Sequence, residues 1–514
     1  MTRVHASTHL FRRQICRPSR QGGAFLLVFA LLLVIGVAWL GVRVLSTAGL
    51  PVTAAPAALV EARDALFGAT SQTTGAAPVI AGVKSPGRMP APDFLDPAGG
   101  PPNVYDGNTN LACARSTWVA GATLTTLGGP GGVATTLRCL GRLPWANLGL
   151  GSYAAVPAND PLGLIPWYAI SANLADACVK ALNPAILNTT YAAFATGACA
   201  LVLPPSRPFP WLTVRDPKGN LVTDRAAVVL ILPGPALAAQ ARPVAPMQGP
   251  AAYLDTVVVT AGCAQPCVPG TYDNARFNWP DNVGLSFIQC APPGSVSTSD
   301  PSYGQPYNCN DRIVFITIDE LMEIAERRVT QYLADELRGY FDANRFFPYA
   351  APLSETTAAL RGQCQNTVTS GLIPAKATTV APANPSPCTH AEFSSRLQSW
   401  FNINLWGDYS YYAVAGDCTQ PTPAAGPLAN CGGGTGVRLA AGGTGNARAL
   451  VIGAGAAIAA APFAASKLAA QVRPSTAISD YLDSVENSNG NTVYDSPTSL
   501  TSRSYNDKVM VVAP

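Results

Sequence analysis

The amino-acid sequence predicts an α+β protein: an N-terminal transmembrane helix followed by two tandem units, each a helix plus a small antiparallel sheet, stapled by disulfide bonds. Three observations support this fold class. Residues 22–42 form an uncharged apolar run, all but one of the 13 cysteines follow that run, and several segments occur twice in the same order. We expect a basic leader over residues 1–23, a transmembrane helix over 24–42, a first unit with long loops over 43–317 and a second unit over 318–514.

The apolar run is long enough to cross the hydrocarbon core of a bilayer, about 30 Å thick, as a helix. No acidic residue precedes it, whereas five arginines do: Arg3, Arg12, Arg13, Arg17 and Arg20. By the positive-inside rule, the N-terminus is then cytoplasmic and the rest of the chain is translocated.

Composition narrows the function classes. Only 12% of the residues are charged and the net charge is +3, so we expect no basic surface for nucleic acid. Three histidines leave little room for a His-based metal centre or a Ser-His-Asp hydrolase, and His5 and His9 precede the apolar run. We therefore expect no catalytic residue, no metal and no cofactor.

Three interpretations of the N-terminal segment stay open. A cleaved secretory signal would end near residues 46–48, but its apolar run is longer than such signals have. A permanent signal anchor is the second interpretation. In the third, the stretch Arg20-Gln21-Gly22-Gly23-Ala24, followed by a long apolar helix, resembles the leader of type IV prepilins.

The prepilin resemblance implies a processing site at Gly22, Gly23 and Ala24. A dedicated peptidase would cut after Gly23, or after Gly22, and methylate the new N-terminus. Prepilins commonly carry Glu at mature position five, where this sequence has Val28 or, for the earlier cut, Leu27. The tip pseudopilin of type II secretion also lacks that glutamate, so the resemblance is to an end component rather than to the repeating filament subunit.

The cysteines are typical of a disulfide framework in an oxidising compartment, because an even number of them follows the apolar run. Near neighbours form natural couples, but the sequence leaves the connectivity open. The C-x3-C spacing at 263–267 has no second close pair or histidine, which argues against zinc. The disulfide candidates are Cys113, Cys139, Cys178, Cys199, Cys263, Cys267, Cys290, Cys309, Cys364, Cys388, Cys418 and Cys431, with 178/199, 290/309 and 418/431 as such couples.

An internal duplication organises the chain after the apolar run. The order of the matched segments is the same in both halves and their spacings are similar, which indicates a repeat. The matches are Gly141–Pro144 with Gly371–Pro374, Trp167–Ile170 with Tyr411–Val414, Leu230–Ala239 with Val451–Ala460, Tyr253–Val257 with Tyr481–Val485, and Asn310–Ile316 with Asn506–Val512.

Each unit is expected to open with a helix. In the second unit, apolar residues from Ile318 to Phe341 follow the 3.6-residue period, and Thr317 with Glu320 predicts a capping box. In the first unit, the membrane helix and residues 56–69 take this place. A long helix followed by a small antiparallel sheet is the general plan of pilin-like domains, so the resemblance implies two pilin-like units.

Several patterns suggest chemistry but have simpler explanations. The G-x-G-x-x-I pattern at 453–458 resembles a dinucleotide-binding turn, yet its counterpart contains prolines, which favours a packing turn. Residues 106–110 have the spacing of a calcium loop without its glycine and glutamate. His390 could activate Cys388 only as a free thiol. Aromatic residues at 400–412 are expected to be mainly core.

Two aspartate pairs occupy equivalent places in the repeat: Asp255 matches Asp483, and Asp311 matches Asp507. A duplicated carboxylate more often holds a turn or a helix end than performs acid–base catalysis. We therefore expect a structural role for these four side chains.

The predicted function is that of a non-catalytic minor pilin or pseudopilin-like component of a type IV pilus or type II secretion system, at the tip or in initiation. Its partners would be the inner membrane, other pilin subunits and the prepilin peptidase, with no nucleic acid. It would be a single-pass protein of the bacterial inner membrane with a periplasmic body, able to join a surface filament. The alternative is a permanently membrane-anchored periplasmic or surface binding protein or adhesin.

Overall fold

The chain divides into two compact parts, residues 1–57 and 58–514, and the architecture below belongs to the second. The first and second units named below are the two halves of the repeat, and both are described within this second part. The computed structural model describes residues 55–70, 86–90, 92–93, 107–108, 138–157, 160, 162–171, 174, 182–188, 211–237, 240, 242, 250–259, 266–275, 286–290, 309–355, 368–374, 390–419, 431, 436–439, 446–457, 471, 473–495 and 505–513.

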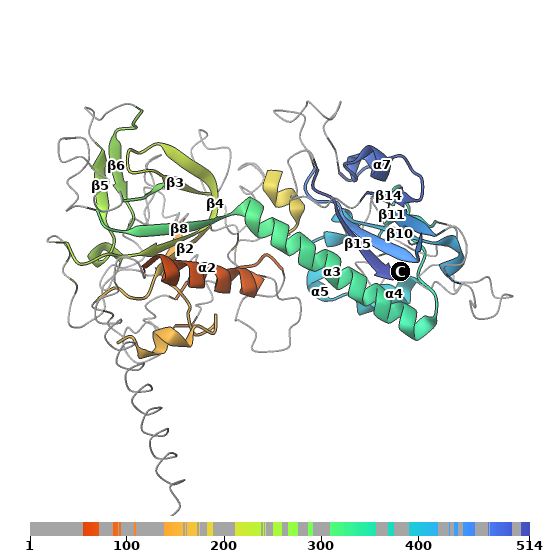
Figure 1. Ribbon diagram of the computed structural model, residues 1–514, viewed down its shortest axis with the longest axis horizontal. Coiled ribbons are helices and arrows are strands. Elements are labelled where there is room, and N and C mark those ends of the chain that lie inside the picture. Colours follow the sequence, from red (N-terminus) through yellow and green to blue (C-terminus); the bar gives the residue numbers. More distant parts are fainter. Residues whose placement is uncertain are drawn as a thin grey trace, which may run out of the picture. The chain divides into compact units, whose positions relative to one another are not determined.

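The first sheet has six strands arranged around the long strand β4 (Leu221–Leu232) (Figure 1). The second half of β4 pairs with β2 and β8, its first half pairs with β3, and β3 pairs with β7 in parallel. Residues 226–232 are all buried, as an apolar run covered on both faces requires. The other strands are β1 (Arg138–Arg142), β2 (Trp167–Ser171), β3 (Leu212–Arg215), β7 (Ser286–Ile288) and β8 (Arg312–Thr317).

The second sheet has four antiparallel strands in the order β15-β13-β10-β9. They are β9 (Ser370–Leu372), β10 (Ser410–Val414), β13 (Ala449–Gly453) and β15 (Lys508–Ala513). This order matches β8-β4-β2-β1 of the first sheet. The register matches too: Leu230 lies between Tyr168 and Val314, as Val451 lies between Tyr412 and Met510. The segments that repeat in the sequence are therefore equivalent strands.

Two smaller sheets complete the β-structure of the described residues. One pairs β5 (Thr256–Val259) with β6 (Gly270–Asp273). The other joins β11 (Val437–Leu439) to β12 (Asn446–Ala447) and to β14 (Val493–Tyr494), and packs on the core of the second sheet through Val437 and Tyr494.

Helix α3 (Ile318–Asn344) confirms the predicted helix and its capping box. Thr317 is both the last residue of β8 and the N-cap of α3, and its side chain accepts a hydrogen bond from the Glu320 backbone N–H. The apolar face of α3 packs on β13 and β15. The other helices are α2 (Ala55–Thr70), α4 (His390–Arg396), α5 (Ser399–Ile403) and α7 (Val485–Ser488).

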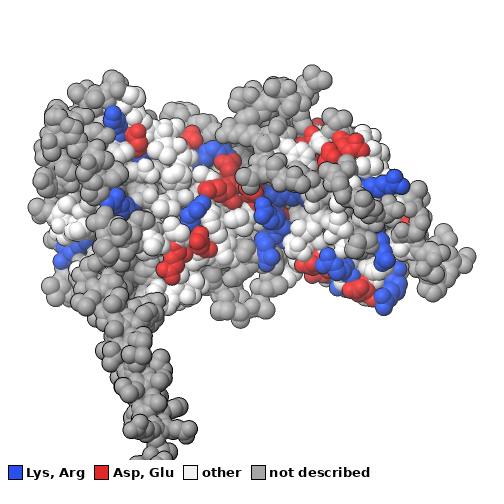
Figure 2. Space-filling view, viewed as in Figure 1, with Lys and Arg blue, Asp and Glu red and all other residues white. Residues whose placement is uncertain are grey.

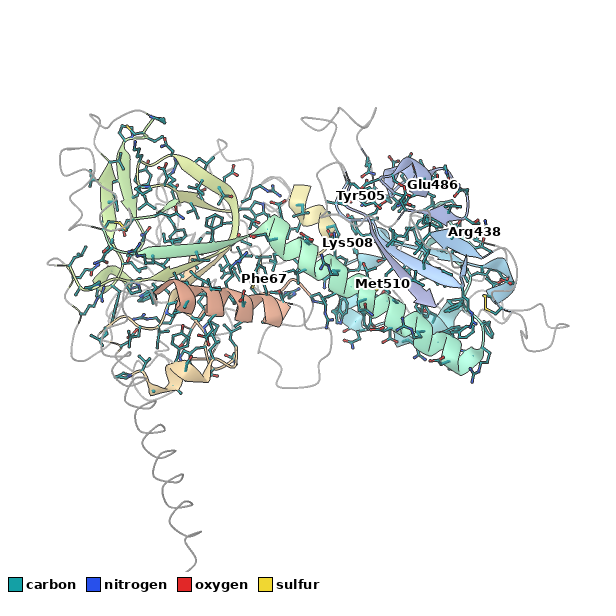
Figure 3. All side chains as sticks on the ribbon, viewed as in Figure 1. Phe67, Arg438, Glu486, Tyr505, Lys508 and Met510 are labelled. Atoms are coloured by element: carbon teal, nitrogen blue, oxygen red, sulfur yellow. A yellow bond between two sulfur atoms is a disulfide. The ribbon has the colours of Figure 1, made fainter. Side chains whose placement is uncertain are left out.

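Ion pairs tie α3 to strands and to α2. Asp319 at its first turn receives Arg225 of β4 at 2.7 Å, and Glu320 receives Arg63 of α2 at 2.8 Å. Farther along, Glu326 pairs with Lys508 of β15. Figure 3 labels Lys508 beside α3. On the face shown in Figure 2, acidic and basic side chains are interspersed rather than gathered by sign.

The predicted fold class is wrong. The described residues contain more strand than α-helix, and the first sheet has six strands, including a parallel pair that no pilin-like unit was expected to have. Helix α3 follows the last strand of the first sheet directly, and its apolar face packs on the second sheet. The repeated segments were matched correctly to each other. The strands between them correspond as well, because β3 pairs in antiparallel with β4 and in parallel with β7, as β11 pairs in antiparallel with β12 and in parallel with β14.

The predicted membrane topology also needs correction. None of the helices among the described residues combines the length and the apolar character needed to cross a bilayer. The predicted span at residues 24–42 and the processing residues Gly22, Gly23 and Ala24 lie outside the described residues. The predicted location as a single-pass inner-membrane protein is therefore without support in the structure.

Candidate functional site

Two buried aspartate pairs lie at equivalent ends of the two sheets. Asp311 and Asp507 directly precede β8 and β15, and Asp255 and Asp483 each follow a short turn that ends in a buried Tyr-Leu pair. All four side chains are buried. A buried carboxylate is costly without hydrogen bonds. The role of each pair therefore depends on which groups donate hydrogen bonds to its carboxylates.

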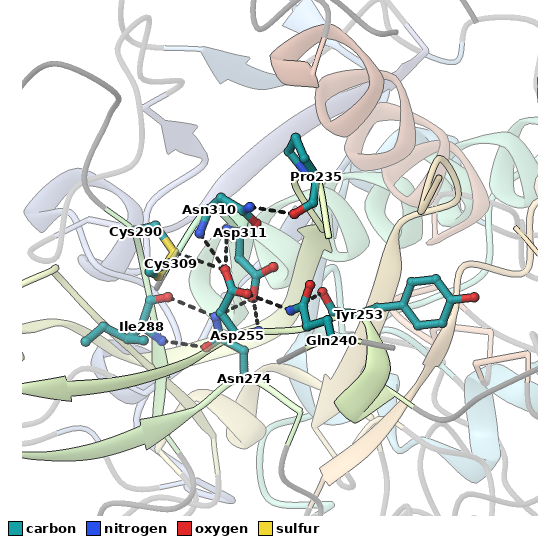
Figure 4. Close-up of a disulfide and its surroundings, with 10 residues drawn as sticks. All are labelled: Pro235, Gln240, Tyr253, Asp255, Asn274, Ile288, Cys290, Cys309, Asn310 and Asp311. Atoms are coloured by element: carbon teal, nitrogen blue, oxygen red, sulfur yellow. Dashed lines mark hydrogen bonds between the residues drawn. A yellow bond between two sulfur atoms is a disulfide. The ribbon is translucent and has the colours of Figure 1, made fainter. Parts of the chain in front are cut away.

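In the first pair, each aspartate accepts a hydrogen bond from the backbone of the other (Figure 4). The Asp255 N–H donates to Asp311 Oδ2 at 2.8 Å, and the Asp311 N–H donates to Asp255 Oδ2 at 3.0 Å. The Asn310 N–H also donates to Asp255 Oδ2, at 2.5 Å. These bonds fasten the start of β8 to the start of β5.

Two amide side chains extend this arrangement to further segments. Asn274 donates from Nδ2 to Asp311 Oδ2 and to the Ile288 carbonyl, and accepts the Ile288 N–H on Oδ1. Gln240 donates from Nε2 to Asp255 Oδ1 at 2.7 Å. We call Gln240, Asp255, Asn274, Asn310 and Asp311 the first network. It joins β5, the end of β6, β7 and β8.

The second network repeats this pattern with Gln471, Asp483, Asn487, Asn506 and Asp507. Its hydrogen bonds are Asp483 N to Asp507 Oδ2 (2.8 Å), Asn506 N to Asp483 Oδ2 (2.7 Å), Gln471 Nε2 to Asp483 Oδ1 (2.9 Å), Asn487 Nδ2 to Asp507 Oδ2 (3.1 Å) and Asp495 N to Asn487 Oδ1 (2.6 Å). Five hydrogen bonds thus join equivalent donors to equivalent acceptors in the two halves of the chain.

An arginine flanks each network without pairing directly with its carboxylates. Arg242 donates to Gln240 Oε1 and to the Tyr253 carbonyl, and Arg473 donates to Gln471 Oε1 and to the Tyr481 carbonyl. Each guanidinium carbon lies over the ring of the same tyrosine, 5.2 Å and 5.5 Å from its centroid. The arginines therefore hold the turn that carries the first aspartate of each pair.

A glycine allows the asparagine of each network to approach the chain. Asn310 donates from Nδ2 to the Pro235 carbonyl at 2.7 Å, and Asn506 donates to the Ala456 carbonyl at 2.8 Å. A Cβ at the glycine before each carbonyl residue, Gly234 or Gly455, would lie 2.4 Å or 2.2 Å from the asparagine side chain. The G-x-G pattern is thus a packing feature here.

The networks differ at the residue before the asparagine. In the first it is Cys309, bonded to Cys290, whereas in the second it is Tyr505. The Tyr505 hydroxyl accepts from Asn487 Nδ2 at 3.3 Å and donates to the Asp495 carbonyl at 3.2 Å. A phenol therefore ties two segments together in the second network where a disulfide does so in the first.

Burial shifts the acidity of these groups. Burial, together with the neighbouring Asp255 charge, raises the pKa of Asp311 well above its usual range. Burial and the Asp483 charge raise the pKa of Asp507 to about 8. Burial also raises the pKa of Asp255, although hydrogen bonds from Asn310, Asp311 and Gln240 oppose that shift.

One cluster has the residue types of a metal site. Asp255, Cys290 and Cys309 bring their potential ligand atoms within 4.8 Å of one another. Both sulfurs are held in the disulfide, and Asp255 Oδ2 already accepts two backbone hydrogen bonds. The 3.9 Å approach of Cys290 Sγ to Asp255 Oδ2 is a packing contact, because a disulfide sulfur carries no proton. This cluster therefore does not suit a metal ion while the disulfide is intact.

The first unit also buries an ion pair. Arg142 on β1 contacts Asp160 at 3.1 Å, with each side chain 1% exposed, and its guanidinium carbon lies 4.2 Å from the Trp167 ring and 4.4 Å from the Tyr253 ring. The residue at the same register position in the second sheet is Leu372. Arg142 thus fills a core position that an apolar side chain fills in the other unit.

The structure places the other sequence-predicted candidates as follows. Disulfides join Cys290 to Cys309 and Cys418 to Cys431, and Cys267 is also disulfide-bonded. Most of the aromatic residues at 400–412 are buried. The side chains of His390 and Cys388, and most of the loop at 106–110, lie outside the described residues. Sequence reasoning matched the four aspartates but missed Gln240, Arg242 and Asn274 with their counterparts, because single polar residues in loops carry no periodic signal.

Comparison with known proteins finds no match: no family model, no curated protein and no solved structure is similar to this chain.

Proposed function

We propose that the protein is a non-catalytic structural component that works in an oxidising compartment. The observation that carries the proposal is the repeated network. In both units the carboxylates and amides are bound to backbone groups that join separate strands. Such bonds hold a sheet in one conformation, whereas acid–base catalysis needs a carboxylate that can reach a substrate.

The disulfides support the proposed location in an oxidising compartment. Cys290–Cys309 and Cys418–Cys431 close loops of 19 and 13 residues in sequence separation. Disulfides of this kind persist outside reducing cytosol, and each contributes about 2–4 kcal/mol by restricting the unfolded chain.

The proposal is tested by isolating the protein from its own cells with thiols blocked at lysis. Peptide mapping without reduction should recover Cys290 joined to Cys309 and Cys418 joined to Cys431. Chemical cross-linking before lysis should place the chain in a particle larger than a monomer. Free thiols at these four positions, or a monomer with turnover of a substrate, would overturn the proposal.

The finer role, an end component of a pilus or of a secretion pseudopilus, rests only on the leader residues Gly22, Gly23 and Ala24. Its test is the N-terminal residue of the protein from cells with and without their prepilin peptidase. A methylated start at Ala24 or Gly23 that depends on the peptidase would support it, whereas an intact Met1 or Thr2 would exclude it.

A second candidate, a binding protein, is favoured by exposed aliphatic side chains near two turns. The β3–β4 and β5–β6 turns are hydrogen-bonded to each other, from Val268 N to the Lys218 carbonyl at 2.9 Å. Around them four large aliphatic side chains are 40–56% exposed: Leu221, Val222, Val258 and Val268. If these side chains bind a partner, serine at Leu221 and Val222 should abolish the cross-linked particle while the thermal unfolding midpoint stays unchanged.

A further inference from the structure

The second network places two carboxylates in one buried site and leaves one oxygen of Asp507 without a donor among the described residues. Asp483 accepts from Gln471 Nε2 on Oδ1 and from the Asn506 N–H on Oδ2. Asp507 accepts from the Asp483 N–H and from Asn487 Nδ2, both on Oδ2. Within the described residues, Asp507 Oδ1 is buried and has no hydrogen-bond partner.

The cations around Asp507 are engaged elsewhere. Every hydrogen bond of Arg473 to the described residues goes to a carbonyl or amide oxygen: those of Ala454, Gly455, Asp480, Tyr481 and Gln471. Lys508 pairs with Glu326 of α3. Arg473 therefore lowers the cost of a charge on Asp507 only at a distance.

The remaining titratable groups facing this site do not supply a counter-charge. Tyr505 uses its hydroxyl on Asn487 and the Asp495 carbonyl, and burial raises its pKa, so it stays neutral. Asp483 donates its backbone N–H to Asp507 Oδ2, and the charge of its carboxylate repels a second negative charge. Two carboxylates that share a desolvated site cannot both ionise cheaply.

We propose that the second network is a proton-operated latch: the folded protein holds a proton on Oδ1 of Asp507 at neutral pH, and loss of that proton loosens the join between β15 and residues 481–487. The protonated Oδ1 becomes a neutral hydroxyl, which removes the repulsion from Asp483. Oδ2 keeps its two hydrogen bonds. Ionisation leaves both carboxylates charged and a buried Oδ1 without a donor.

The direction of the pH effect follows from this assignment. In the unfolded chain Asp507 has its ordinary pKa of 3.8, whereas in the folded chain its pKa is about 8. The stabilising contribution of the bound proton is fully present below pH 3.8 and is lost as the pH rises through 8. Between these limits the unfolding equilibrium constant rises up to about tenfold per pH unit from this group.

The test is urea unfolding of the full chain from pH 5 to pH 9, followed by tryptophan fluorescence. We expect D507N, which mimics the protonated acid, to remove about one proton from the pH dependence and to be at least as stable as the wild type at pH 9. D342N, at an exposed aspartate of α3, is the matched control and should follow the wild type. A D507N pH dependence equal to that of the wild type would overturn the proposal.

A second measurement tests the proposal if D507N does not fold. The D311N chain lacks Asp311, whose pKa burial raises well above its ordinary value. Its infrared spectrum should show the carbonyl band of a protonated carboxyl group at pH 6.5, and this band should lose intensity above pH 8. Absence of that band at pH 6.5 would refute the proposal. So would a pH dependence that disappears on adding millimolar Ca²⁺ or Mg²⁺, since a cation would then occupy the place of the proton.

Discussion

Asn506 and Gly455 show how closely side chain and backbone meet in these networks. The amide of Asn506 lies where a Cβ at residue 455 would sit, and Gly455 has a φ of +60°. Any larger residue at this position would therefore displace Asn506 and lose its bond to the Ala456 carbonyl. The backbone N–H of Asn506, which donates to Asp483, would move with it.

We predict that Gly455→Ala destabilises the protein more than Gly149→Ala. Both glycines have positive φ, but nothing lies within 4 Å of a Cβ at Gly149. The Gly149 variant should therefore lose only the backbone strain, about 1 kcal/mol, whereas the Gly455 variant should lose about 1–3 kcal/mol more through displacement of Asn506. Urea unfolding of the two variants measures the difference, and equal losses would contradict the packing argument.

The buried Arg142–Asp160 pair makes a second residue-scale prediction. Asp160→Ala leaves the Arg142 guanidinium buried without its counter-charge and also removes the acceptor of the Leu164 and Ile165 N–H groups. The expected loss of unfolding free energy is about 3–5 kcal/mol.

The control for this variant is Asp335→Ala, which breaks an ion pair to Arg338 whose side chains are 55% and 48% exposed. An exposed pair contributes about 0–1 kcal/mol, so the control should be near neutral. If the two variants lost similar stability, the buried pair would be no more than a surface contact in energetic terms.

At the scale of elements, a helix or strand could be predicted from the sequence when the pattern that indicates it lies within a few neighbouring residues. Helix α3 was predictable from its period and from Thr317 and Glu320, because a capping box lies within four residues. The strands of the repeat could be matched because their apolar runs recur in order. Strands β3 and β7 could not be paired in advance, since a parallel pairing depends on contacts between segments some 70 residues apart that share no pattern.

Thr317 joins strand β8 to helix α3, and its hydroxyl caps the N-terminus of the helix. Thr317→Ala should cost about 1 kcal/mol, within a range of about 0.5–2, because the Glu320 N–H loses its acceptor. Thr317→Ser keeps the hydroxyl and should be nearly neutral. The measurement is the urea midpoint of both variants, and an alanine variant as stable as the serine variant would show that the cap is dispensable.

At the scale of the whole molecule, the same arrangement of strands and hydrogen bonds occurs twice, and different interactions stabilise the two copies. Both units have the same four-strand order, register and network of hydrogen bonds. The sequence could show that the aspartates correspond, but not that they are buried, because their partners come from loops with little sequence similarity. The first unit adds the Cys290–Cys309 disulfide beside its network, and the second uses Tyr505 at the matching place.

This difference predicts that reduction acts on one network only. Cys309 directly precedes Asn310, whose N–H donates to Asp255, so breaking the disulfide frees the residue that positions that donor. Amide hydrogen exchange at Asn310, Asp311 and the start of β8 should therefore rise in the C290S/C309S variant. Exchange at Asn506, Asp507 and the start of β15 should not change, because Tyr505 ties the equivalent segments together without a thiol.

The control is the C418S/C431S variant, which loses the other disulfide and should leave both sets of amides unaffected. If exchange rose equally at the starts of β8 and β15, the two networks would form one cooperative unit, and the independence of the two halves would have to be abandoned.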